Sequence, residues 1–319
     1  MENKIKTIFM GTPELAAVGL QALIDDGHFD VKLVITQADK AVGRNLKINK
    51  PAVKILAEKN NIKVIQPLKI KEATEIIEEI APDLIVVIAY GKIIPKDILD
   101  SPKYGCINVH GSLLPKYRGS ACIQATILNG DKQGGITIMK IDETMDTGDI
   151  IKKISVNLEK EETSHSLMEK IKKISQENLA QTIIDFIEGK IKSEKQNNSL
   201  ATYVKMIKKE DGHLKFNESA EIIERKIRAY FPWPGTFAFI EKEALPKKEI
   251  LFKILKAGEI VDKNEKLENG QLIKIDQKIG VSCQDKILVI DQLQLEGKKA
   301  SNSEDFLKGN SWVLGKILK

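Results

Sequence analysis

The chain has 319 residues, 42% of them hydrophobic and 30% charged, and it carries a net charge of +5. This length and composition are ordinary for a soluble globular protein with two domains. The 3 cysteines form no CxxC pair, which argues against a disulfide framework or a zinc ribbon and indicates a reducing compartment. The N-terminus lacks the apolar core of a signal peptide, and no apolar run is long enough to cross a bilayer. We therefore expect a cytoplasmic protein.

The excess of positive charge is uneven, because most of it lies after residue 204. A basic bias in the smaller part of a chain indicates a polyanionic partner such as nucleic acid. A lysine-rich solvated surface explains the same charge equally well. Charge alone does not decide between the two.

Strand and helix signals alternate over the first 190 residues. The run 83–89, DLIVVIA, is continuously apolar, as a parallel strand covered on both faces requires. This alternation predicts an α/β fold with a doubly wound parallel sheet. Two predicted helices begin at Pro13, with Thr12 as N-cap, and at Pro51. Three further predicted helices cover 70–80, 120–129 and 163–188. The predicted strands are 5–9, 31–36, 64–65, 83–89, 106–110, 135–141 and 149–156.

The turn after the first strand reads Gly11-Thr12-Pro13. A dinucleotide-binding turn needs the pattern G-x-G-x-x-G, and its second glycine is missing here. We therefore expect a plain strand-to-helix turn rather than a nicotinamide site.

The next connection, 37–49, is long for a link between a strand and a helix, and it is predicted to be a polar loop. Lys40, Arg44 and Lys47 are spaced along it. Long basic loops near a catalytic face can clamp phosphates. A mobile surface loop is the alternative.

The composition changes after residue 190. The polar segment 191–205 is interpreted as an interdomain linker. One helix at 220–229 follows, and then short strands separated by Gly, Asp and Asn, which is typical of a small β-barrel. We predict a first domain over 1–190 and a second domain over 206–319, whose strands are 236–240, 250–256, 270–275, 279–283 and 287–294.

The most informative stretch is 105–119, GCINVHGSLLPKYRG. Asn108 and His110 share one face of a strand and stand just before a glycine. Open α/β sheets place their chemistry at the carboxyl ends of strands. An amide that donates a hydrogen bond beside an imidazole that moves a proton suits attack on a carbonyl. A buried structural histidine is the alternative, and the neighbouring amide favours catalysis.

The acidic segment 142–149, DETMDTGD, follows the next predicted strand. That strand is predicted to be the next parallel strand of the sheet, so the adjacent strand ends are expected to meet, and a carboxylate there can pair with protonated His110. Asp142, Asp146 and Asp149 are also candidate ligands of a hard cation. One loop of carboxylates without a second cluster supports a metal only weakly, so we expect none.

Ser112-Leu113-Leu114-Pro115 is unusual for a surface loop. Two leucines followed by a proline predict either one wall of an apolar pocket or a loop tucked into the core. Lys116, Tyr117 and Arg118 come next and are interpreted as possible contacts to an anion.

Over nearly its whole length the chain resembles the folate-dependent formyltransferases. The segments Asn-x-His-x-Ser-Leu-Leu-Pro and Asp-x-Gly-Asp are specific to them, including those that act on glycinamide ribonucleotide or amino sugars. The C-terminal barrel and the loop 37–49 favour the methionyl-tRNA formyltransferase family among them. The resemblance is carried by residues 9–13, 82–91, 105–119, 142–149, 231–235 and 297–300.

The resemblance implies a Rossmann-like domain that binds 10-formyltetrahydrofolate and an OB-like β-barrel domain that helps to hold tRNA. Asn45 and Leu46 stand where the family often has further basic residues. The implied site residues are Asn108, His110 and Asp146 for catalysis, Ser112, Leu113, Leu114 and Pro115 for folate, and Arg44 for tRNA.

The predicted function is transfer of a formyl group from 10-formyltetrahydrofolate to the amino group of methionine on initiator methionyl-tRNA, in support of translation initiation. One alternative is a folate-dependent formyltransferase that acts on an amino sugar or nucleotide sugar. Another is a nucleic-acid-binding protein without turnover. The expected protein is a cytoplasmic monomer that uses no metal.

Overall fold

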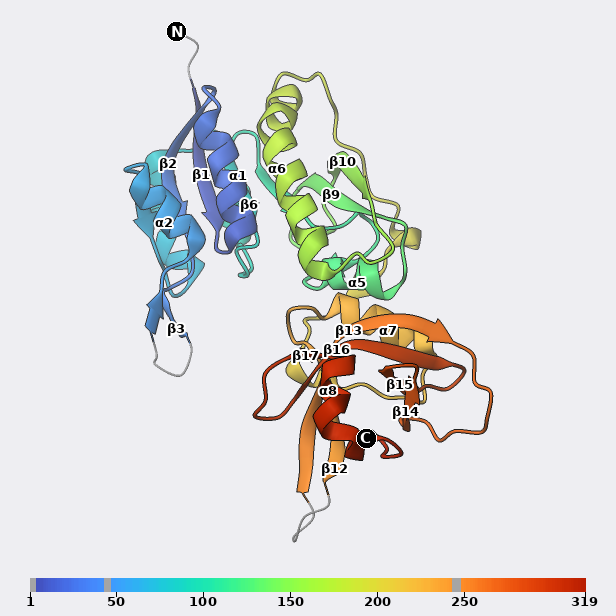
Figure 1. The fold of residues 1–319 in the computed structure, drawn as a ribbon. Coiled ribbons are helices and arrows are strands. Elements are labelled where there is room, and N and C mark those ends of the chain that lie inside the picture. Colours follow the sequence, from blue (N-terminus) through green and yellow to red (C-terminus); the bar gives the residue numbers. More distant parts are fainter. Residues whose placement is uncertain (1–3, 43–46, 243–247) are drawn as a thin grey trace. The chain divides into compact units, whose positions relative to one another are not determined.

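The computed structural model describes residues 4–42, 47–242 and 248–319 (Figure 1). The chain divides into two compact units. The first consists of Met1–Cys122, Gln133–Asn157 and Met168–Val204, and the second of Ile123–Lys132, Leu158–Leu167 and Lys205–Lys319. Among the described residues, no helix is both long and apolar enough to span a membrane.

A seven-stranded sheet forms the centre of the first unit, in the order β10-β9-β7-β6-β1-β2-β5. The five strands from β5 to β7 are parallel, whereas β9 and β10 form an antiparallel edge. The predicted α/β sheet is therefore confirmed. Its strands are β1 (Ile5–Gly11), β2 (Phe29–Ile35), β5 (Lys63–Ile65), β6 (Leu84–Ile88), β7 (Cys106–His110), β9 (Gln133–Lys140) and β10 (Ile150–Asn157).

The helices of this unit are α1 (Glu14–Asp25), α2 (Ala52–Lys59), α3 (Thr74–Ile80), α4 (Lys96–Leu99) and the greater part of α6 (Ser164–Ile187). They cover both faces of the sheet (Figure 1). On one face α1 and α6 meet at Gly19, where an added Cβ would lie 2.3 Å from Ile88 and 3.4 Å from Leu179. On the other face, Ile8 of β1 joins a buried cluster with Ile77 of α3. Burial on both faces explains why the strands are continuously apolar.

Two helix starts differ from the prediction. Pro13, not Thr12, is the N-cap of α1, because the Pro13 carbonyl accepts the first helical hydrogen bond from the Ala17 amide at 3.1 Å. The stretch predicted as one helix over 70–80 begins with a 3-10 turn, Ile70–Ala73, and only then continues as α3.

The connection 37–49 is not a purely irregular loop. Its described residues form two short antiparallel strands, β3 (Lys40–Val42) and β4 (Lys47–Asn49). Arg44 lies between them, outside the described residues.

The direction of the strand beside β7 also differs from the prediction. β9 runs antiparallel to β7, with His110 opposite Thr137 and Ile107 opposite Lys140. The segment 142–149 therefore leaves β9 near the amino end of β7, and the expected meeting of parallel strand ends is wrong. A parallel strand needs a helix that crosses back over the sheet. The helix before β9, α5 (Cys122–Leu128), belongs almost entirely to the second unit.

The second unit is built on an antiparallel sheet in the order β12-β13-β16-β15-β14, with β17 paired to β16. The C-terminal segment bridges both edges of this sheet, through Ile240 with Leu318 and Gln271 with Ile317. This half-closed sheet confirms the predicted OB-like barrel. Its strands are β12 (Thr236–Lys242), β13 (Lys248–Val261), β14 (Leu272–Ile275), β15 (Lys278–Ser282), β16 (Ile287–Leu295) and β17 (Ser301–Asn302).

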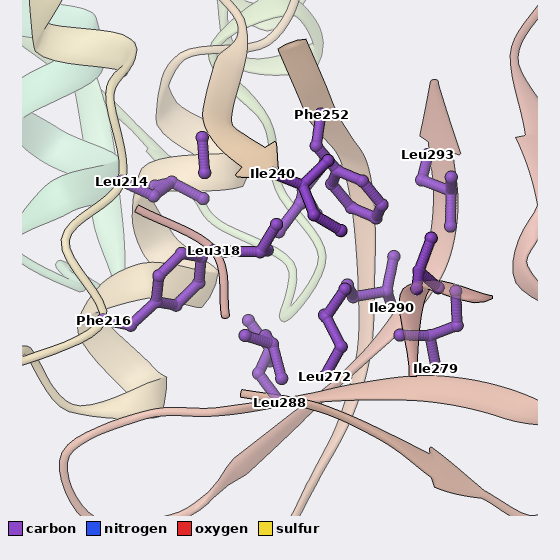
Figure 2. Packing of buried hydrophobic residues seen from close by; sticks show 14 of the residues in the cluster. Leu214, Phe216, Ile240, Phe252, Leu272, Ile279, Leu288, Ile290, Leu293 and Leu318 are labelled. Atoms are coloured by element: carbon purple, nitrogen blue, oxygen red, sulfur yellow. The ribbon is translucent and has the colours of Figure 1, made fainter. Parts of the chain in front are cut away.

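The core of the second unit gathers side chains from every part of the barrel. Phe252, Leu288, Leu293 and Leu318 lie in one cluster (Figure 2). The predicted helix α7 (Ala220–Ala229) adds buried isoleucines to it at i, i+4 spacing. A further helix, α8 (Ser303–Asn310), was not predicted and contributes a buried phenylalanine.

Candidate active site

His110 ends β7, and its side chain is buried, with an exposed fraction of 7%. Its Nε2 lies 2.9 Å from the Tyr117 carbonyl oxygen, and its Nδ1 lies 3.7 Å from a carboxylate oxygen of Asp146. A carbonyl oxygen only accepts hydrogen bonds, so Nε2 carries a hydrogen and donates it. Asn108 is half-buried on the same strand, and its amide forms no hydrogen bond with the described residues. The amide can therefore donate to a substrate.

Asp146 reaches His110 although β9 runs the other way. Its backbone is left-handed, with φ 56°, and its Oδ2 accepts a 2.7 Å hydrogen bond from the Gly119 amide. Gly119 belongs to β8 (Arg118–Gly119), which pairs in parallel with β11 (Tyr203–Val204). An added Cβ on Gly119 would lie 2.2 Å from a β11 carbonyl oxygen, so only glycine fits. This backbone holds one carboxylate oxygen and leaves the other beside the imidazole.

The surroundings of His110 favour its protonated form. Burial lowers the pKa, because the imidazolium loses water. The Cys122 sulfur, the Asp146 carboxylate and the Tyr117 carbonyl act in the opposite direction, and together they raise the pKa of His110 from 6.5 to about 9. At neutral pH the imidazole is therefore a cationic hydrogen-bond donor.

The turn after β7 is anchored on the residue opposite His110. The Thr137 hydroxyl donates to the Ser112 carbonyl at 2.7 Å and accepts from the Leu114 amide at 3.0 Å. This buried threonine fixes the turn beside the imidazole. Among the four predicted folate contacts, Ser112 and Leu114 are buried, and Leu113 and Pro115 are partly exposed.

Arg118 is not placed to meet an anion, contrary to the interpretation of its sequence position. It is only 1% exposed. Its guanidinium donates to the Gln196 amide oxygen at 2.7 and 3.1 Å, to the Asn198 amide oxygen at 2.7 Å and to the Tyr203 hydroxyl at 2.9 Å. All these groups belong to the segment 191–205, which the first unit includes as far as residue 204.

Gln196 was missed by the sequence reasoning. It is 9% exposed, and its amide nitrogen donates to the Asp146 carbonyl at 2.9 Å and to the Gly148 carbonyl at 2.8 Å. Its polar neighbours in the sequence indicate a linker, and no apolar periodicity marks the burial. No local signal marks Gln196, because its partner Arg118 lies 78 residues away along the chain.

The predicted tRNA contact, Arg44, lies outside the described residues, so its contacts are not defined. Within the described ranges, no group of three or more His, Cys, Asp or Glu side chains could hold a metal ion. A hollow of about 560 Å³ lies at the opposite end of β7, beside Cys106. None of the predicted catalytic, folate-binding or tRNA-binding residues lines it, whereas Asp142, a candidate cation ligand, does.

Comparison with known proteins identifies the family. Residues 3–183 match Formyl transferase, and residues 206–311 match Formyl transferase, C-terminal domain. The chain belongs to the formyl transferase family. A methionyl-tRNA formyltransferase of Geotalea uraniireducens (strain Rf4) is 42% identical over 317 residues, which cover 98% of this chain and 98% of the relative. One from Clostridioides difficile (strain 630) is 38% identical and covers 98% of this chain and 100% of its own.

Solved structures share the fold. The N-formyltransferase from Helicobacter canadensis, in complex with folinic acid and dTDP-3-aminofucose, has a TM-score of 0.64 and 24% identity, and covers 90% of this chain and 99% of its own. A sugar 3N-formyl transferase in the presence of dTDP and 5-N-formyl-THF has a TM-score of 0.63 and 22% identity, and covers 93% and 100%. At these identities the likeness concerns the fold alone.

Proposed function

We propose that this chain transfers the formyl group of 10-formyltetrahydrofolate to the amino group of methionine on initiator tRNA. Full-length relatives with this name, 38% and 42% identical, support this function over an amino-sugar substrate, since the sugar-modifying structures described above are at most 24% identical. The observation that carries the chemistry is the contact of the buried His110 imidazole with the Asp146 carboxylate at 3.7 Å.

The reaction begins when the methionine amine attacks the formyl carbon. A new N–C bond forms, and negative charge grows on the formyl oxygen. The Nε2–H of His110 is engaged by the Tyr117 carbonyl, so its Nδ1–H, at 3.7 Å from Asp146, is the donor left for this oxygen. With the free amide of Asn108 it supplies two donors, each worth about 3–4 kcal/mol by comparison with other oxyanion sites. The intermediate then collapses as the bond between the formyl carbon and folate N10 breaks.

Protons must move in the same reaction, because the attacking amine loses one and folate N10 gains one. The Asp146 oxygen that faces His110 is the proposed acceptor of the amine proton, and it passes this proton on to folate N10, directly or through one water. Its other oxygen is occupied by the Gly119 amide. Together with the Cys122 sulfur, the same carboxylate keeps His110 charged, so the scheme needs no metal ion and no covalent enzyme intermediate.

The folate is proposed to bind along the turn 112–115. Leu113 and Pro115 are its partly exposed residues, and their apolar side chains suit a planar ring system. The buried side chains of Ser112 and Leu114 would act through the backbone that Thr137 holds in place.

We propose that Arg44 and the C-terminal OB-like unit contact tRNA. The strands of this unit form the half-closed barrel described above. The protein is proposed to act as a cytoplasmic monomer. These assignments rest on the family and on the excess of positive charge after residue 204.

The decisive experiment is a single-turnover assay with purified protein, 10-formyltetrahydrofolate and initiator methionyl-tRNA. We expect formylmethionyl-tRNA to form, and we expect Asn108→Ala and Asp146→Ala to lower the rate at least about a hundredfold while folding normally. Transfer to a nucleotide-linked amino sugar but not to tRNA would favour the sugar alternative. No transfer to either acceptor would favour a binding protein without turnover.

A further inference from the structure

Asp146 lies in a closed circuit of hydrogen bonds that begins and ends on β8. The Gly119 amide binds its carboxylate, and Gln196 donates to its carbonyl at 2.9 Å. The other end of the Gln196 amide accepts from Arg118, the residue that precedes Gly119, at 2.7 Å. The circuit fixes both the backbone and the carboxylate of Asp146 relative to one short strand.

The buried side chain of Arg118 determines how the Gln196 amide is oriented. Arg118 finds only uncharged partners among the described residues, so its burial is not explained by an ion pair. A guanidinium donates and never accepts. The oxygen of the Gln196 amide must therefore face Arg118, and its NH₂ group must face the carbonyls of Asp146 and Gly148. The arginine thus determines which end of the amide meets the active-site loop.

The loop needs such support. Asp146 has a left-handed backbone, with φ 56°, which residues other than glycine adopt only where their surroundings hold them. Its contact with His110 is also long, at 3.7 Å, so a small displacement of the loop would separate the two groups. Gln196 is in effect saturated, because it donates twice and accepts twice.

We propose that Gln196 and Arg118 are positioning residues that hold Asp146 against His110, and that the catalytic rate depends on them through this contact. The catalytic part of this inference rests on the proposed function. The structural part, that the Gln196 amide holds the Asp146 carboxylate beside the imidazole of His110, does not.

The first test is Gln196→Met, which keeps the length of the side chain and removes every hydrogen bond. NMR titration of the His110 ring is expected to show its pKa lowered by about one unit or more, since the Asp146 charge moves away. The single-turnover rate is expected to fall at least about tenfold, with folate affinity unchanged within about twofold. Gln133→Met is the matched control, because it is the same substitution in the same unit. The Gln133 amide of β9 donates a hydrogen bond to Asn157 of β10, away from the proposed site. It should change neither quantity.

A double-mutant cycle separates positioning from general stability. In an Asp146→Asn background, Gln196→Met should lower the rate by less than about twofold, because the group it positions is already gone. Gln196→Glu is the second variant if the methionine chain does not fold. It retains an acceptor for Arg118 but loses both donors to the loop, so we expect a folded and slow enzyme.

A folded Gln196→Met or Gln196→Glu chain with an unmodified rate would overturn the inference, as would an unchanged pKa of His110 in Gln196→Met. The inference would also be overturned if Gln196→Met lowered the rate by the same factor in the unmodified chain and in the Asp146→Asn background. If the unmodified chain transfers no formyl group to methionyl-tRNA, the proposed function fails, and the NMR titration still decides whether the amide holds Asp146 against the imidazole.

Discussion

The charge of Asp146 should control how the reaction rate depends on pH. In Asp146→Asn the side chain keeps its shape and an oxygen for the Gly119 amide, but the negative charge beside His110 is removed. The pKa of His110, about 9 in the unmodified protein, must then fall, because burial still lowers it and one of the contacts that raise it is lost. The variant should therefore lose the imidazolium at a lower pH.

The size of the effect follows from the geometry. Two charges 3.7 Å apart interact by roughly 4 kcal/mol at an effective dielectric constant of about 20, or about 3 pKa units. Measured shifts from a neighbouring opposite charge are about 1–3 units, so we take a fall of about two, to about 7. At pH 6 both proteins then keep His110 more than about 90% protonated, whereas at pH 8.5 the protonated fractions are about 75% and about 3%. The deficit of the variant should grow about 20-fold between these pH values.

The assay is single-turnover formyl transfer with saturating folate at several pH values between 6 and 8.5. The quantity to compare is the ratio of the two rates, because ionisation of the methionine amine is common to both proteins and cancels. Loss of the proton acceptor lowers this ratio equally at every pH, whereas loss of the imidazolium makes it fall as the pH rises. A ratio that stays constant across the range would refute the claim that the Asp146 charge controls the pKa of a catalytic His110.

Two further substitutions, one of them with a control, test the support of the site, and another tests tRNA binding. Gly119→Ala should destabilise the fold by about 3 kcal/mol or more and slow the reaction, because its Cβ would meet a β11 carbonyl at 2.2 Å, whereas Gly189→Ala, also at positive φ but with open space around it, should cost about 1 kcal/mol in urea unfolding. Thr137→Val should cost about 2–4 kcal/mol by leaving the Ser112 carbonyl and Leu114 amide unpaired, and it should weaken folate binding in a calorimetric titration; an unchanged folate affinity would contradict the proposed role of the turn. Arg44→Ala should weaken binding of methionyl-tRNA and reduce its salt dependence while folate affinity stays the same, and a loss of folate affinity instead would make the loop a folate clamp.

The parts of the fold that the sequence predicted are those with a local signal. Residues 84–88 of the apolar run 83–89 form a buried parallel strand, and the helix 220–229 has the predicted bounds. The direction of β9 has no such signal, because parallel and antiparallel strands of this length share the same alternation. It depends on where α5 packs, which is a property of the whole chain. The closure of the barrel by Leu318 is equally non-local.

The candidate site divides in the same way. Asn108 and His110 lie two residues apart on one strand, so the strand period alone places them together. Gln196 lies in a polar segment without apolar periodicity. Its burial depends on four hydrogen bonds to distant residues, which the sequence does not indicate. A segment whose order comes from hydrogen bonds rather than from apolar burial looks like a linker in the sequence.

The contacts that hold Asp146 do not depend on the strand that carries Asn108 and His110. The groups that hold Asp146 come from positions 27 and 50 residues away along the chain, and the arginine and glutamine that link them are 78 residues apart. None of these contacts involves β7, so each can be lost while the strand that carries Asn108 and His110 keeps its sequence and its place in the sheet. An intact Asn-x-His motif is therefore a necessary but not a sufficient sign of an active site in such a chain. What completes the proposed site is a carboxylate held at one oxygen by a glycine amide and at its backbone by a glutamine that a buried arginine orients.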